Sequence, residues 1–178
     1  VWWELTALSS VFLIWASRTE SAIRAGQRYL IIQVTSGLLL LLGAILLHAE
    51  SGSIVFEHIG LESAGGWFVF MAFGIKACFP LLHGWMKDSY PEATITGTVF
   101  LSGFTTKLAI YALARGFAGT EILIPIGATM TAFPIFFAVI ENDLRRVLAY
   151  SLINQVGFMI VGVGLGTALS LNGTAAHA

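Results

Sequence analysis

Charged residues are scarce in this sequence, and their scarcity is the first guide to its class. Only 11% of the 178 residues are charged, whereas a soluble domain carries about 25%. Hydrophobic residues make up 57% of the chain, and the mean hydropathy is +0.84. The alternating pattern of membrane-spanning strands is also missing. This composition places the chain in a membrane and favours helices over a barrel.

Basic runs, metal-ligand spacings and a second cysteine are also missing. A formal net charge of −1 without a basic cluster argues against binding nucleic acid or another polyanion. No His/Cys spacing suits a metal site. Cys78, the one cysteine, cannot form an internal disulfide and is expected to be an inert buried side chain. We therefore expect no nucleic-acid partner, no metal and no cofactor.

Apolar segments of helical length dominate what remains. A helix needs about 20 apolar residues to cross about 30 Å of hydrocarbon. We predict an all-α polytopic transmembrane bundle of about six helices, in one domain over 1–178, with the helices at 1–16, 29–47, 67–87, 93–115, 121–140 and 144–168. A short interfacial helix is predicted at Ile54–Leu61. The chain begins without methionine and ends without a polar stop, so we expect an internal piece of a longer membrane protein.

The loops between these helices differ in charge. Six basic residues fall in loops on one side of the membrane: Arg18, Arg24, Arg28, Lys87, Arg145 and Arg146. Arg115 falls on the opposite side, together with an acidic loop. Because cytoplasmic loops carry the excess of Lys and Arg, the six-charge side is predicted to be cytoplasmic.

The predicted helix at 67–87 contains Lys76 near its centre and Pro80 one turn later. A lysine ammonium at that depth costs several kcal/mol. Proline leaves a backbone carbonyl without its helical partner. Together they predict a broken transmembrane helix, with a titratable group at the break, as ion transporters have.

Two further ionisable residues lie at membrane depth. Glu4 is about 21 Å from the cytoplasmic end of its helix, and Lys107 is about 12 Å from the other surface, at 1.5 Å per residue. The charge state of a buried Glu–Lys pair depends on separation and hydration, which a proton relay requires. We predict Glu4 as the partner of Lys76 and Lys107 as the next proton acceptor. The alternative is that these charges only fix helix packing.

Other polar residues have two interpretations each. His83 is placed to carry protons between Lys76 and water, or is an interfacial histidine of no special role. Tyr150, Ser151 and Asn154, beside Gln155, either hold helices together or form a proton path. His177, at the end of the chain, is grouped with that polar path without a role of its own.

Four stretches together resemble a known family. They are WWELTALSSVFLIW, GIKACFPLLHGWMKDSYPEAT, FTTKLAIYALAR and ENDLRRVLAYSLINQVGFMIVGVGLG. In order and spacing they look like the antiporter-like subunits shared by respiratory complex I and the Mrp-type multisubunit sodium/proton antiporters. The tail after Lys107 looks closest to the D-type Mrp subunit. One departure is Met86-Lys87-Asp88, where family members commonly have Leu-Pro-Asp.

The resemblance implies a function and a larger architecture. It implies that Glu4, Lys76 and Lys107 form a proton-translocation path, and that the chain corresponds to the fifth to tenth helices of a fourteen-helix subunit. We therefore expect a proton-translocating, non-enzymatic subunit of a multisubunit cation/proton antiporter in a bacterial inner membrane. Its partners would be other membrane subunits, the lipid bilayer and protons, with Na⁺ as a candidate second ion.

Two alternatives stay open. One is a complex I-type or hydrogenase-linked subunit, in which a redox reaction elsewhere drives the same relay. The other is a structural membrane scaffold whose buried charges serve packing alone. No carboxylate cluster suited to bare Na⁺ is evident, so sodium coupling does not follow from the residues.

Overall fold

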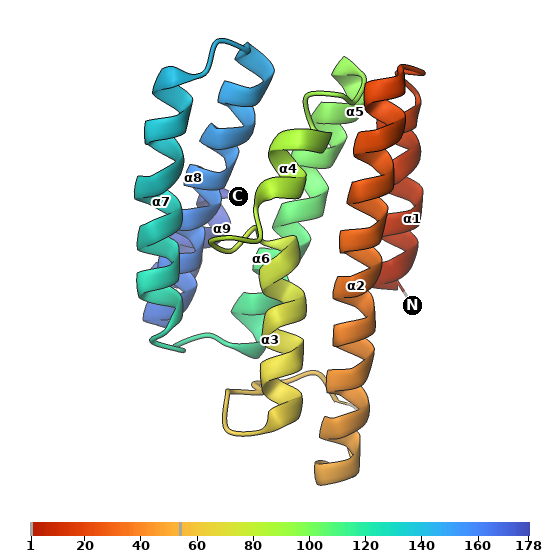
Figure 1. Ribbon diagram of the computed structural model, residues 1–178. Helices are drawn as coiled ribbons and strands as arrows, with labels where there is room; N and C mark the ends of the chain where they lie inside the picture. The colour runs from red at the N-terminus through yellow and green to blue at the C-terminus, as the bar shows by residue number, and fades with distance from the viewer. Residues whose placement is uncertain (1, 54) are drawn as a thin grey trace.

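Three groups of helices stand side by side in the computed structural model, which describes residues 2–53 and 55–178 (Figure 1). Helices α1 and α2 form one hairpin, α3 to α6 lie in the middle, and α7 and α8 form a second hairpin with α9 beside it. All the regular elements in this part of the chain are helical, which confirms the predicted all-α bundle. Among the described residues, four helical stretches are long and apolar enough to cross a membrane: Glu20–Ser51, Ile95–Gly116, Leu123–Ile140 and Leu144–Leu165.

The first hairpin joins α1 (Trp2–Trp15) to α2 (Glu20–Ser51). The predicted start of the first helix, Val1, lies outside the described residues. α2 begins nine residues before the predicted start at 29, because the Thr19 side chain caps it by accepting from the Ala22 N–H. Its 32 residues are about 48 Å long, so its basic first turns extend beyond the hydrocarbon.

The predicted interfacial helix at 54–61 is wrong for residues 55–61, which are not helical, while Ile54 lies outside the described residues. The backbone of this loop bonds to α6 instead of to itself. The Ile59 N–H donates to the Gly116 carbonyl at 2.8 Å, and the Arg115 Nε donates to the Phe56 carbonyl at 3.0 Å.

The middle group contains the interrupted segment. The predicted helix at 67–87 is two helices, α3 (Ala64–Lys76) and α4 (Gly84–Ser89), separated by residues 77–83. α3 and α2 are in close backbone contact at Gly43 and Gly65. A side chain on either glycine would come within 2.9 Å of the other residue's carbonyl oxygen. The predicted helix at 93–115 is continuous but contains a π-helical turn: α5 (Ile95–Phe100), η1 (Leu101–Thr105) and α6 (Thr106–Gly116).

The second hairpin consists of α7 (Leu123–Ile140) and α8 (Leu144–Leu165). The prediction that the last helix continues to 168 is wrong. Gly166 ends α8 with a φ of 64°, and it packs against the backbone at Gly119, where any side chain would clash. Thr167 and Ser170 then form a capping box that starts a further helix, α9 (Ala168–His177).

Three connections lie at the same end of the bundle, at the top of Figure 1: α1–α2, α4–α5 and α7–α8. We call this the arginine-rich end, since it includes the six basic residues of the predicted cytoplasmic side. Arg145 fastens two of the connections together by donating to the carbonyls of Pro91 at 2.8 Å and Ala93 at 3.1 Å.

The orientation can be tested by cysteine labelling. The native Cys78 is fully buried and is first replaced by alanine, which gives a background without a thiol. Single cysteines are then placed at two exposed positions at opposite ends of the bundle, Asn142 and Glu50. With the arginine-rich end in the cytoplasm, a membrane-impermeant maleimide should label Glu50→Cys in intact cells. It should label Asn142→Cys only after permeabilisation. Labelling of both variants in intact cells would contradict this topology.

Candidate functional site

Lys76 is the last residue of α3, and its side chain has no exposed surface. Its Nζ donates to the Trp3 carbonyl of α1 at 3.3 Å and lies 4.1 Å from the centre of the Trp3 ring. No carboxylate within residues 2–53 and 55–178 lies within the 4.0 Å of an ion pair with it. An ammonium with three donors is thus held by one carbonyl and one aromatic face.

A helix cap, formed after Lys76, ends α3 at this point. Cys78 has a left-handed backbone with a φ of 64°. Its N–H donates to the Ile75 carbonyl at 3.2 Å, and the Phe79 N–H donates to the Gly74 carbonyl at 2.9 Å. These two bonds define a Schellman motif, here with a cysteine where glycine is usual. The Phe79 ring packs onto Gly74, which has room for it because it carries no side chain.

Pro80 lies within the interruption, four residues after the helix has ended. It occupies the second position of a turn closed by the Leu82 N–H and the Phe79 carbonyl at 2.8 Å, with Leu81 at a φ of 70°. That geometry corresponds to a type II turn, which favours proline at its second position. The Trp85 indole of α4 donates to the Ile75 carbonyl at 3.0 Å. The first residues of the interruption are therefore bonded to the last turn of α3, and the indole of Trp85 ties α4 to the same turn.

Glu4 lies on α1, one residue after the main-chain partner of Lys76. Its Oε1 is buried without a hydrogen-bond partner among the described residues, and the carboxylate packs directly onto Gly37 of α2. It is close enough to Lys76 for its charge to act on the ammonium. The structure brings the predicted pair into one site, although the two side chains are not joined by an ion pair.

Lys107 lies just beyond the π-helical turn. Its Nζ donates to the Ser102 carbonyl of η1 at 3.1 Å, and the Thr106 hydroxyl approaches the same carbonyl at 3.5 Å. π-helical turns occur mostly as single insertions, frequently at functional sites. Lys107 is half-buried and, like Lys76, is bonded to a backbone carbonyl where the helix is irregular.

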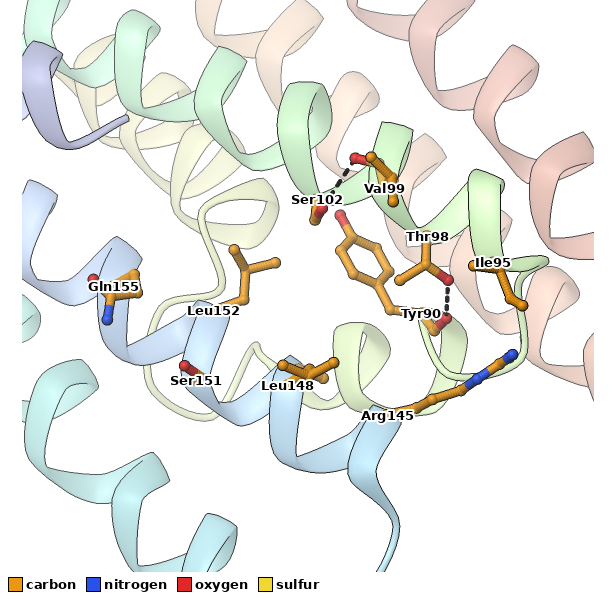
Figure 2. A pocket seen from close by; sticks show the side chains of 11 residues that line it. Tyr90, Ile95, Thr98, Val99, Ser102, Arg145, Leu148, Ser151, Leu152 and Gln155 are labelled. Atoms are coloured by element: carbon orange, nitrogen blue, oxygen red, sulfur yellow. Dashed lines mark hydrogen bonds between the residues drawn. The ribbon is translucent and has the colours of Figure 1, made fainter.

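A cleft of about 420 Å³ separates α8 from the α4–α5–η1 segment (Figure 2). Its polar lining residues are Tyr90, Thr98, Ser102, Arg145, Ser151 and Gln155. Arg145 marks the arginine-rich end of the cleft. Ser102, whose carbonyl binds Lys107, lines it deeper in the bundle. The predicted polar residue Ser151 faces this cleft.

The remaining predicted residues lie elsewhere. The His83 ring packs edge-on against Phe133 of α7, with 5.6 Å between ring centres. Tyr150 is buried and stacks on Phe137. The Asn154 amide donates to the Thr131 carbonyl of α7 at 2.6 Å. His177 of α9 bonds Gln155. These residues join α7, α8, α9 and the interruption, away from Lys76.

Several buried polar residues were missed from the sequence. On α2 they are Tyr29, Gln33 and Ser36, and on α1 Ser10. Ser36 accepts from the Trp3 indole at 3.3 Å and donates to the Ala72 carbonyl at 2.8 Å. Residues 29, 33 and 36 lie on one face of a helix. This spacing is the sequence pattern that could have identified the buried polar face. In the described part of the chain, no group of three or more His, Cys, Asp or Glu is placed to hold a metal ion.

Long apolar helices, an interrupted helix and the fully buried Lys76 are features of an integral membrane protein. The comparison with known families agrees. Residues 1–178 match the family described as "NADH:quinone oxidoreductase/Mrp antiporter, TM", and the chain belongs to this family of antiporter-like subunits. The predicted resemblance is thereby confirmed.

Named relatives occur in several kinds of membrane complex. The chain is 30% identical to Hydrogenase-4 component B of Escherichia coli, covering 97% of this chain and 28% of that protein. It is 29% identical to the D-type subunit of the Na(+)/H(+) antiporter of Alkalihalophilus pseudofirmus, covering 97% of this chain and 39% of that protein. The Mrp complex from Dietzia sp. DQ12-45-1b contains a chain with a TM-score of 0.85 and 25% identity, over 94% of this chain and 35% of that one. The chain therefore spans well under half the length of these relatives.

The Schellman motif predicts an unusual order of stability at Cys78. A residue other than glycine whose backbone is left-handed lowers the stability of the fold by about 1–2 kcal/mol, and β-branched residues lower it most. Cys78→Val should therefore be less stable than Cys78→Gly, although valine is nearer to cysteine in volume. Thermal unfolding of the purified complex, followed by tryptophan fluorescence, measures this. A Gly variant that melts below the Val variant would show that side-chain volume, not backbone conformation, governs this position.

Proposed function

We propose that this chain is the proton-conducting part of a subunit in a multisubunit cation/proton antiporter of a bacterial cell membrane. The observation that carries the proposal is Lys76: a completely buried ammonium group at the end of an interrupted helix, near Glu4 but not joined to it by an ion pair. Family membership and the antiporter subunit among the relatives support the same function.

Lys76 is the proposed proton carrier. A carboxylate that approaches or withdraws changes how firmly a buried lysine holds its proton, and Glu4 takes this role here. Because Lys76 is bound by one carbonyl and an aromatic ring, its ammonium can move without breaking an ion pair. Residues 77–83, which are not helical, allow that movement.

Lys107 is the proposed next acceptor. The cleft beside α8 runs from Arg145 to Ser102, whose carbonyl binds the Lys107 ammonium. Its lining is mostly apolar, with polar side chains such as Thr98 and Ser151 spaced along it, and we propose it as the approach for protons. His83 packs against α7, so its assignment as the carrier between Lys76 and water stays a prediction.

A redox-driven assembly is the second candidate. It is favoured by the Hydrogenase-4 component B relative and by the family's inclusion of NADH:quinone oxidoreductase subunits. In such a complex the same lysine relay would be driven by a reaction in another subunit. Co-purification with flavin or iron–sulfur subunits would support this candidate, whereas further antiporter subunits would support the first.

Removing the Lys76 ammonium tests the relay. In the intact complex, Lys76→Ala should lower proton-coupled transport by about 100-fold or more, as expected for loss of a proton-transfer group, while assembly stays normal. Transport is measured in inverted vesicles with a pH-sensitive dye. Lys87→Ala removes the same charge from a partly exposed position and serves as the control, with near-normal transport expected. Normal transport by Lys76→Ala would reject the relay, and lost assembly would favour the scaffold.

A further inference from the structure

Gln33 of α2 is a buried amide with no bonded partner. Its side chain has no exposed surface, and neither amide atom has a hydrogen-bond partner in the described part of the chain. Within residues 2–53 and 55–178, Oε1 of Glu4 is also buried without a hydrogen-bond partner. Burying an amide without hydrogen bonds is unfavourable. A methionine or leucine would fill the same space without this cost, so packing alone does not explain a glutamine here.

The pairing of α1 with α2 places Gln33 next to Glu4. The two helices are antiparallel: Glu4 packs on Gly37, and Ser10 bonds Tyr29 at 2.6 Å. Midway between these two contacts, Gln33 of α2 lies level with Ala7 of α1, a small and fully buried residue. Gln33 is therefore one helical turn from the Glu4 carboxylate and one turn from the Ser10–Tyr29 pair.

The pairing of α2 with α3 brings Lys76 to the same level. Ser36 donates to the Ala72 carbonyl, and these helices are also antiparallel. Lys76 lies one turn beyond Ala72, and Gln33 lies about one turn before Ser36. Gln33 is thus level with the end of α3, where the interruption begins.

Polar groups continue beyond Tyr29 toward the π-helical turn. The Thr105 hydroxyl, at the end of η1, lies near the phenol groups of Tyr29 and Tyr90. The Tyr90 hydroxyl donates to the Leu101 carbonyl, at the start of η1, at 3.0 Å. Lys107 follows Thr105 by two residues. A row of buried polar groups therefore leads from Glu4 and Lys76, past Gln33, to the segment that carries Lys107.

The spacing within this row suits bridging water. One turn of α2 advances about 5.4 Å, which is longer than a direct hydrogen bond of about 3 Å. A buried water molecule forms about three hydrogen bonds to polar groups that otherwise lack partners. The two amide atoms of Gln33 and the Oε1 of Glu4 are such groups.

We propose that Gln33 is a positioning residue of the conduction path, whose amide, together with Glu4 Oε1, binds water that joins the Glu4–Lys76 site to the Ser10–Tyr29 pair and η1. This inference rests on the proposed proton-conducting function. Gln33 does not itself exchange protons. Its NH₂ group donates hydrogen bonds and its carbonyl oxygen accepts them, which keeps the bridging water ordered between groups that do exchange protons.

Two substitutions separate this role from packing. Gln33→Met keeps the length and shape of the side chain but removes its hydrogen-bonding groups. Gln33→Asn keeps the amide but shortens the side chain, leaving room for water. A packing role predicts that Asn is the more harmful change, and a water-binding role predicts that Met is. Gln27→Met, at an exposed position two turns earlier on α2, is the matched control.

In the intact complex, we expect Gln33→Met to assemble normally and to melt near the wild-type temperature, because methionine keeps the packed volume of the side chain. Its proton-coupled transport should fall by about tenfold or more, as for loss of an ordered proton-transfer partner. Gln33→Asn should retain transport within about threefold of the wild type, and Gln27→Met should be unchanged.

Other outcomes would overturn the inference. Transport by Gln33→Met at the wild-type rate, or a larger loss in Gln33→Asn than in Gln33→Met, would assign Gln33 to packing. So would failure of both Gln33→Met and Gln33→Leu to assemble. Lys76→Ala, measured in parallel, distinguishes failure of this inference from failure of the proposed function. If Lys76→Ala is inactive and Gln33→Met is active, this inference alone fails. If Lys76→Ala is active, the proposed function fails.

Discussion

The ammonium group of Lys76 has to find polar partners away from bulk solvent, and the architecture around it depends on this constraint. Unpaired polar groups in hydrocarbon cost several kcal/mol each, so membrane helices normally satisfy all their backbone groups internally. Here the ammonium takes its partner from the backbone of α1. Lys107 does the same at the π-helical turn. In both places irregular backbone and a lysine bonded to a backbone carbonyl occur together.

The fold was largely predictable because hydrocarbon thickness dictates helix length. The six apolar segments, the interrupted one among them, were found from composition and from the positions of Lys76 and Pro80. The errors have local causes. The start of α2 was missed because a capped, charged first turn lies beyond the apolar segment. α9 was missed because the turn before it depends on a close approach between Gly166 and Gly119, two residues far apart in the sequence.

The ionisable residues of the site were predictable from energetics alone, since each charge at membrane depth needs a reason. Their detailed arrangement was not. Glu4 was predicted as the partner of Lys76 and lies near it, but a main-chain carbonyl and the Trp3 ring occupy the positions next to the ammonium. Gln33 was overlooked because a single polar residue in a leucine-rich helix is common. Its importance depends on which neighbours it faces, and helix pairing decides this.

The close crossing of α2 and α3 has a mechanical consequence. Gly43 and Gly65 bring the two backbones together so tightly that neither helix can slide along the other without collision. The N-terminal part of α3 is thereby held against α2, while its C-terminal end, at Lys76, adjoins seven non-helical residues. The proposed movement of the Lys76 ammonium is therefore confined to the lysine side chain and the non-helical residues beside it, and it leaves the packing of α2 on α3 unchanged.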